Sequence, residues 1–279
     1  MIIIDSQVHI WGPETPDKPY VTENAAKPHR TVPLRAEEVL RLMDEAGVAR
    51  TVAVPPTWEG FSNEESLRAA RLYPDRFAVM GRIAIDKPES RNLLASWKNQ
   101  PGMLGIRTAL HQSRSRLWLE DGTADWLWDA AERYDVPVMV LAPHALGKLG
   151  EIAERHPGLR LIIDHMGLNS ALRGKPLEPA VNDLIKLARL PNVAVKVSAL
   201  PCYVAEPYPF PTLHPLVRRE VDAFGSRRCF WGTDLSHLTC PYKQCVTLFT
   251  EEMKSLSLAE LEWIMGRGIA EWLNWPLPK

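Results

Sequence analysis

Residues 2–11 have the sequence IIIDSQVHIW, an apolar run of strand length that turns polar as it ends. Side chains two positions apart on a strand point to the same side of the sheet, so Gln7 and His9 share one side with Asp5 behind them. A dinucleotide-binding fold needs a G-x-G-x-x-G turn after its first strand, and the residues here do not match that pattern. The stretch therefore predicts a first strand that carries polar groups toward a site.

Further apolar runs of strand length follow, alternating with stretches whose apolar residues recur at helical spacing. Helical spacing is clear in 34–46, which stops at Gly47, and in 64–72 and 125–134. Continuous apolar strands separated by helices are typical of a parallel sheet that is covered on both faces. The further strand candidates are residues 51–54, 77–83, 103–106, 136–141, 159–163, 193–197 and 229–231.

Eight strand and helix units in 279 residues fit a closed (β/α)8 barrel better than an open doubly wound sheet, because such barrels take about 250 residues. We therefore predict an α/β protein with one TIM-barrel domain, residues 1–279. The proline-rich stretch 11–33 is too long and irregular for a simple connection, and it predicts a lid or binding loop.

Composition narrows the classes of partner. Hydrophobic residues make up 46% and charged residues 24%, which is typical of a soluble globular protein. The formal net charge of −1 gives no concentrated positive field for nucleic acid. The apolar start lacks a basic leader, and no run reaches the roughly 18 apolar residues of a membrane span. We expect a cytoplasmic protein that binds a small molecule, with self-association into a homo-oligomer left open.

The four cysteines show no C-x-x-C spacing, and a zinc knuckle or a disulfide framework would need better spacing than they have. We expect all of them to be reduced and without a functional role: Cys202, Cys229, Cys240 and Cys245.

Polar residues gather where the predicted strands end, and in such barrels the chemistry lies at the carboxyl ends of the strands. Of the eight histidines, five fall at or just after a predicted strand end: His9, His111, His144, His165 and His237. Asp234 follows the last strand in the sequence FWGTD. His9, His165 and Asp234 come from three separate strands, and we expect them to converge on one site.

Five segments carry a resemblance to a known family: DSQVHIW, GLRLIIDHMG, PNVAVKVSAL, FGSRRCFWGTD and LEWIMGRGIAEWL. In this order and spacing the sequence resembles the amidohydrolase-related branch (amidohydrolase 2) of the amidohydrolase superfamily. Within that branch it is most similar to the group that holds 2-pyrone-4,6-dicarboxylate lactonase and the sugar lactonases. The resemblance covers nearly the whole chain, and IDHMG followed by WGTD is its most specific part.

The resemblance implies a barrel hydrolase that activates water, in many members with a divalent metal such as zinc or manganese. The implied metal ligands are His9, His165, Asp234 and, at a position used in some branches, His144. Gln7 stands where the family usually has histidine, and a carboxamide oxygen is a weaker ligand for such metals. Metal occupancy is therefore left open. In a metal-free alternative, which similar lactonases use, Asp234 is the general base on water while His9 and His165 polarise the scissile carbonyl.

The implied activity is the opening of a cyclic ester, a lactone of a small anionic metabolite. Arg107 and Lys196 are expected to hold a substrate carboxylate. The complete set of substrate-binding candidates is Gln7, Arg107, His111, Lys196, Tyr203, Trp58 and His237. Two alternatives stay open: a metal-dependent non-oxidative decarboxylase of an aromatic acid, and a catalytically disabled barrel that only binds a small molecule.

Overall fold

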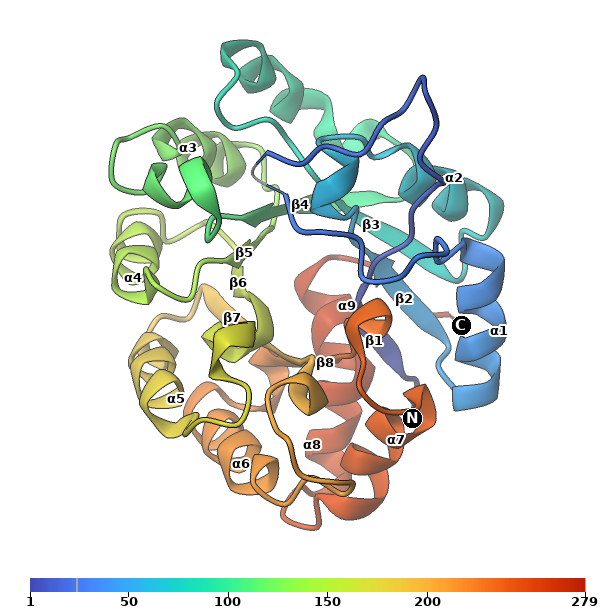
Figure 1. Ribbon diagram of the computed structural model, residues 1–279. Helices are drawn as coiled ribbons and strands as arrows, with labels where there is room; N and C mark the ends of the chain where they lie inside the picture. The colour runs from blue at the N-terminus through green and yellow to red at the C-terminus, as the bar shows by residue number, and fades with distance from the viewer. Residues whose placement is uncertain (24, 279) are drawn as a thin grey trace.

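The computed structural model describes residues 1–23 and 25–278, which form a barrel of parallel strands inside a ring of helices (Figure 1). In one sheet the strands follow one another in chain order, as the sequence predicted. Their bounds are β1 (Ile4–Val8), β2 (Arg50–Ala53), β3 (Phe77–Gly81), β4 (Met103–Ala109), β5 (Val138–Leu141), β6 (Leu161–Ile163), β7 (Val193–Ser198) and β8 (Cys229–Gly232).

Three strands, β3, β5 and β6, are shorter than predicted, and backbone N–H groups explain this for β5 and β3. Pro137 has no N–H to give to a neighbouring strand, so β5 begins at Val138, two residues later than predicted. The N–H of Arg82 donates to Asn63 Oδ1 at 2.7 Å, outside the ladder, so β3 ends at Gly81.

The α-helices cover the outside of the barrel (Figure 1). Gly47 ends the first of them in the left-handed conformation, with φ +80°, as the sequence predicted. The bounds are α1 (Ala36–Ala46), α2 (Glu64–Leu72), α3 (Asp125–Arg133), α4 (Leu146–Arg155), α5 (Glu178–Ile185), α6 (Leu213–Phe224), α7 (Tyr242–Thr247), α8 (Leu258–Glu262) and α9 (Gly268–Trp272).

Short 3₁₀ and π turns fill many of the connections. They are η1 (Thr57–Glu59), η2 (Pro88–Asn99), η3 (Ser113–Leu117), η4 (Asp164–Gly167), η5 (Ser170–Leu172), η6 (Lys186–Arg189), η7 (Leu200–Cys202), η8 (Ser226–Arg228), η9 (Leu235–His237), η10 (Leu248–Glu252) and η11 (Trp263–Arg267). Among the described residues, no helix has the length and apolar character needed to cross a membrane.

Polar contacts join β8 to β1, where the barrel closes. The buried Asp5 carboxylate accepts from the N–H of Thr233 at 2.9 Å and from the Tyr242 hydroxyl at 2.8 Å. The N–H of Asp234 donates to the Gln7 carbonyl at 2.9 Å. A side chain at Gly232 would place Cβ 2.5 Å from Ser6 Oγ, so only glycine lets the two strands approach this closely. The closure holds the ends of β1 and β8, and therefore Gln7 and Asp234, side by side.

Apolar side chains fill the barrel interior, which explains the continuous apolar strands of the sequence. The residues of this layer that lie on the strands or directly after one are Ile4, Val52, Val54, Ala78, Met80, Met139, Ile162, Ala194 and Phe230. Lys196 is fully buried at the same level, with its ammonium 3.4 Å from Met139 Sδ. A buried charge in such a layer needs compensation, and the strand ends provide it.

The proline-rich stretch after β1 folds back over the barrel, where it appears in dark blue near β2, β3 and β4 (Figure 1). The N–H of Val21 donates to the Trp58 carbonyl at 2.8 Å, and the N–H of Ala26 donates to Thr57 Oγ1 at 2.8 Å. These bonds fasten the loop to the β2–α2 connection and carry His29 to the edge of the central cavity.

Candidate active site

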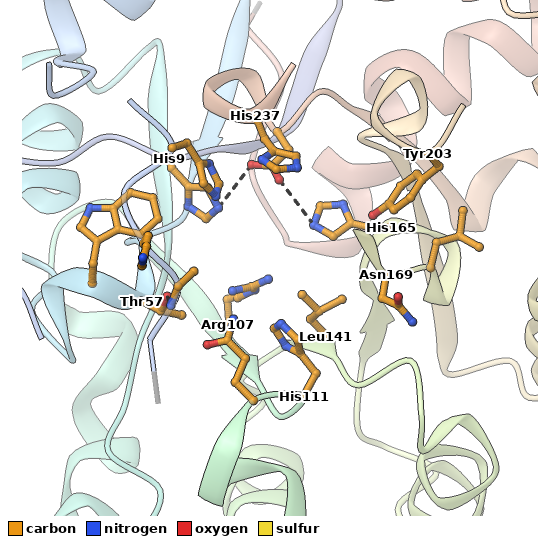
Figure 2. Close-up of a pocket in the computed structure, with 16 residues that line it drawn as sticks. His9, Thr57, Arg107, His111, Leu141, His165, Asn169, Tyr203 and His237 are labelled. Carbon is orange, nitrogen blue, oxygen red and sulfur yellow. Dashed lines mark hydrogen bonds and ion pairs between the residues drawn. The ribbon is translucent and has the colours of Figure 1, made fainter. Parts of the chain in front are cut away.

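A cavity of about 290 Å³ opens at the carboxyl ends of the strands (Figure 2). Side chains from β4 and β5, from the residues directly after β1, β6 and β8, and from several loops surround it. The lining residues are His9, Ala26, Lys27, His29, Thr57, Trp58, Arg107, His111, Gln112, Leu141, His165, Leu168, Asn169, Tyr203, Asp234 and His237.

Three residues that lie far apart in the sequence meet at this cavity. His9 Nε2 is 3.3 Å from Asp234 Oδ1, and His165 Nε2 is 4.0 Å from Asp234 Oδ2. Dashed lines in Figure 2 mark these contacts at the labelled His9 and His165 rings. Each of the three residues is more than nine-tenths buried. The structure thus brings His9, His165 and Asp234 together around one small volume.

The His9 ring has a defined tautomer. Its Nδ1 lies 2.7 Å from the Val54 carbonyl, which can only accept, so Nδ1 carries the proton and donates it. In the neutral ring Nε2 then offers a lone pair, and the Gln7 side-chain amide lies 3.3 Å from it as a donor. Asp234 Oδ1 faces the same Nε2, and within the described residues it is buried without a hydrogen-bond partner. Because the Gln7 amide already uses the Nε2 lone pair, Asp234 Oδ1 is the acceptor of this pair that is left without a donor.

The backbone at two of these residues is strained. His165 has φ +53° and Asp234 has φ +55°, so both lie in the left-handed region that residues other than glycine rarely adopt. Each such conformation costs about 1–2 kcal/mol, and residues held this way cluster at functional sites. The turns aim both side chains inward directly after β6 and β8.

Burial and neighbouring charge set the protonation of the three residues. Burial lowers the pKa of His9 to about 3 against the attraction of Asp234. Burial likewise lowers the pKa of His165 to about 4, although Asp164 and Asp234 oppose it. For Asp234 burial acts to raise the pKa, but the attraction of His9 and His165 outweighs it and holds the pKa at about 2. At neutral pH the site therefore has two neutral imidazoles and an ionised carboxylate.

Below the cavity lies a buried network of charges. Arg107 and Lys196, which were expected to hold a substrate carboxylate, both pair with a carboxylate of the protein itself. Asp164 pairs with Lys196 Nζ at 2.7 Å and with Arg107 Nε at 2.9 Å. Burial acts to raise the pKa of Asp164, but these two cations outweigh it and hold that pKa well below its usual range. The Lys196 ammonium also donates to Gln7 Oε1.

Lys196 and Gln7 are fully buried and are not among the residues that line the cavity. The expectation that Lys196 and Gln7 contact the substrate is therefore wrong, because both side chains lie deeper in the barrel than the cavity. Both bind to each other and to the strand ends instead, because a charge in the apolar interior must be paired. Arg107 does line the cavity.

The remaining candidates divide in the same way. His111, Tyr203, Trp58 and His237 line the cavity. His144 is exposed and lines a separate surface hollow with Pro143 and Leu146. Because Leu141 fills the place that β5 offers to the cavity, His144 is carried outward with the following loop and does not join the three central residues.

Sequence reasoning did not select His29, since it follows no strand. Its ring lies 4.6 Å from the His237 ring and 5.0 Å from the Trp58 ring, between centroids, and its Nδ1 is 3.0 Å from Ser236 Oγ. The length of the proline-rich stretch was the only signal for this contribution. Thr57, Lys27 and Asn169 were missed for the same reason, because loops alone position them.

The residues do not fit the metal centre that the resemblance implies. Gln7 Oε1, the atom that would replace a histidine ligand, is bound to the Lys196 ammonium, whose charge also repels a cation. Throughout residues 1–23 and 25–278, no three His, Cys, Asp or Glu side chains are grouped so as to hold a metal ion.

Comparison with known proteins places this site in a family. The sequence model described as amidohydrolase matches residues 4–275. The chain belongs to the amidohydrolase family. The match confirms the resemblance seen in the sequence. Because the family is one of hydrolases, this protein is a hydrolase.

Individual relatives agree with this assignment. An L-fucono-1,5-lactonase from Burkholderia ambifaria is 29% identical over 237 residues, which cover 83% of this chain and 79% of that protein. The crystal structure of an amidohydrolase from Burkholderia multivorans with bound zinc has a TM-score of 0.81 at 21% identity, covering 99% of this chain and 100% of its own. A probable 2-pyrone-4,6-dicarboxylic acid hydrolase from Acinetobacter baumannii, crystallised with citric acid, has a TM-score of 0.78 at 20% identity, with the same coverage. At these identities the two crystal structures show a shared fold.

Proposed function

We propose that this amidohydrolase opens the ring of a small anionic lactone, using a water molecule that Asp234 activates as general base. The observation that carries the proposal is the Asp234 carboxylate, which lines the cavity and whose Oδ1 has no hydrogen-bond partner in the described part of the chain. A water in the cavity that donates one hydrogen to this carboxylate keeps its own lone pair free to attack the substrate carbonyl. The relationship to an L-fucono-1,5-lactonase supports a lactone as the substrate class.

The reaction needs hydrogen-bond donors that polarise the scissile carbonyl, and the side chains of His165 and Arg107 supply them. The buried Ser198 hydroxyl lies 2.8 Å from His165 Nδ1. When that hydroxyl donates, the ring carries its proton on Nε2, toward the cavity. Arg107 binds Asp164 through Nε, and it lines the cavity. These donors stabilise the oxyanion as water attacks. His9 carries its proton on Nδ1 and accepts from the Gln7 amide at Nε2, so it has no proton to offer the carbonyl.

Proton transfer then balances within the site. Asp234 takes a proton from the attacking water as the C–O bond forms, and it returns a proton to the ring oxygen as the ester bond breaks. A carboxylate with a pKa of about 2 is ionised at every physiological pH but is a weak base. The oxyanion donors must therefore supply much of the rate enhancement. No step in this scheme requires a metal ion.

The size and charge of the cavity support a small anion. A volume of about 290 Å³ lies at the lower end of ligand pockets, so the cavity suits one small ring. Arg107 and Lys27 bring positive charge to the lining. Of the lining residues in the described part of the chain, Asp234 alone is acidic. With Arg107 donating to the oxyanion, Lys27 is the cation of the described lining that is left to bind a substrate carboxylate.

The test is turnover of a panel of sugar lactones and lactones of small dicarboxylic acids by wild type and by Asp234→Asn. We expect the variant to fold normally and to lose about 10²–10⁴-fold in kcat, the usual contribution of a general base. The matched control is Asp183→Asn, which removes a surface carboxylate paired with Lys186 and should leave the rate unchanged. Rates should also survive chelation. Full activity of Asp234→Asn, or activity only on aromatic acids with added metal, would contradict the proposal.

A further inference from the structure

Two cysteines face each other close to the candidate active site. Cys240 and Cys245 have Sγ atoms 3.6 Å apart, within range of a thiol hydrogen bond. Cys245 is buried in α7, whereas Cys240 is half-buried just before that helix. The sequence alone does not predict this contact, because a separation of five residues matches no redox or metal motif. The pair was expected to have no role, and its geometry suggests one.

The pair divides into a reactive and a resolving thiol. The hydrogen bond from Cys245 lowers the pKa of Cys240, while that bond and burial raise the pKa of Cys245 well above its usual value. Oxidant-sensitive cysteines are accessible, rich in thiolate and placed next to a second thiol. The other cysteines lack this combination. Burial raises the pKa of Cys202 to about 12, and Cys229 is fully buried.

The segment that carries Cys240 also carries part of the active site. Residues 235–240 connect Asp234 to the start of α7, and His237 within them lines the cavity. The N–H of His237 donates to the Asp234 carbonyl at 2.7 Å. Thr239 Oγ1 donates to the Pro201 carbonyl at 3.0 Å, which ties the segment to the loop after β7. A displacement of Cys240 is therefore transmitted over a few residues to His237 and Asp234.

We propose that Cys240 and Cys245 form a peroxide-sensitive thiol pair whose disulfide reshapes the loop beside the active site. The Cys240 thiolate attacks one oxygen of hydrogen peroxide, the O–O bond breaks, and the sulfenic acid and one water form after proton uptake. Cys245 then attacks the sulfenic sulfur, the S–S bond forms, and the S–O bond breaks with release of a second water. The two thiols lose two electrons and peroxide gains them.

Bond formation requires movement. A disulfide brings the sulfurs to about 2.05 Å, so the present 3.6 Å must shrink by roughly 1.5 Å. Cys245 is held in α7, since its carbonyl accepts from Trp231 Nε1 at 3.3 Å and the helix begins at Tyr242, which binds Asp5. Cys240 lies in a connection and moves more easily. We expect the oxidised protein to lose at least about fivefold in kcat/KM because His237 and Asp234 shift, a consequence that rests on the proposed lactonase function.

In the test, the protein of residues 1–279 is treated with hydrogen peroxide, and its mass and its disulfide-linked peptides are measured. We expect a loss of about 2 Da and a Cys240–Cys245 crosslink that dithiothreitol reverses. Cys240→Ser and Cys245→Ser should each abolish the crosslink, whereas Cys202→Ser, the matched control, should retain it. Oxidation that proceeds to sulfinic acid at Cys240, or that bypasses the pair, would overturn the proposal.

Two further readouts separate this proposal from the lactonase function. On a lactone that the reduced protein turns over, a reversible loss of rate supports the switch, and an unchanged rate in the crosslinked protein refutes it. If no lactone is turned over, the lactonase proposal fails by itself. Hydrogen exchange of residues 232–241 then decides the switch, because the disulfide must change the protection of this loop and unchanged protection would refute the effect.

Discussion

Glu220 should make the stability of the folded protein depend on pH, because it is a buried carboxyl group. It lies on α6 with its side chain fully buried, and in the described part of the chain neither carboxylate oxygen has a hydrogen-bond partner. Burial raises its pKa from 4.5 to about 8. The folded protein therefore keeps Glu220 protonated at pH 7, while the unfolded chain ionises it.

The magnitude follows from proton linkage. A folded-state pKa above the unfolded value means that the contribution of Glu220 to stability is complete below about pH 4.5 and is lost as the pH rises through about 8. Each pH unit in this window costs about 1.4 kcal/mol. Wild type should thus lose roughly 4 to 5 kcal/mol of unfolding free energy at this residue between those limits.

Glu220→Gln removes the titration while keeping the shape of the side chain. We expect the free-energy difference between variant and wild type to grow, in favour of the variant, by about 3–4 kcal/mol from pH 5 to pH 8. Urea unfolding at several pH values measures it. The matched control is Glu251→Gln, an exposed glutamate whose replacement should leave a pH-independent difference. Parallel stability curves for wild type and Glu220→Gln would refute the reasoning.

Three further predictions address the site. Gln7→His should gain no zinc affinity in calorimetry while Lys196 remains, because the Lys196 ammonium repels the ion. The double variant Gln7→His with Lys196→Met should gain zinc affinity. Tight zinc binding by the single variant would contradict this reasoning. In buffer that contains a chelator, kcat/KM should stay level from about pH 5 to 8. It should fall below about pH 5, as His165, with a pKa of about 4, and then Asp234 take up protons. A midpoint of this decrease near pH 6.5 would contradict the prediction. Gly232→Ala should lower the unfolding free energy by about 1–3 kcal/mol in urea, since its Cβ would meet the end of β1, and an unchanged midpoint would rule out the close approach.

The sequence by itself determined the architecture. Apolar runs of strand length separated by helical periodicity leave few folds for a chain of this length, because each strand must be covered on both faces. Gly47 ends α1 where its position predicted, since glycine accepts a positive φ without strain. His9, His165 and Asp234 were also found from the sequence, because a barrel gathers the ends of its strands at one face and the position of each residue after its strand fixes that face.

Only the tertiary structure decided which polar residues reach the cavity and what each one binds. Gln7 and Lys196 satisfy the positional rule, but the rule gives no depth along the barrel axis, and charge pairing with Asp164 keeps Lys196 in the interior. His144 satisfies it too, yet its loop turns outward. His29, and likewise the contact between Cys240 and Cys245, depend on loop paths that periodicity does not encode. Repeating patterns record burial against the core, whereas distances between loop residues arise only when the whole chain has folded.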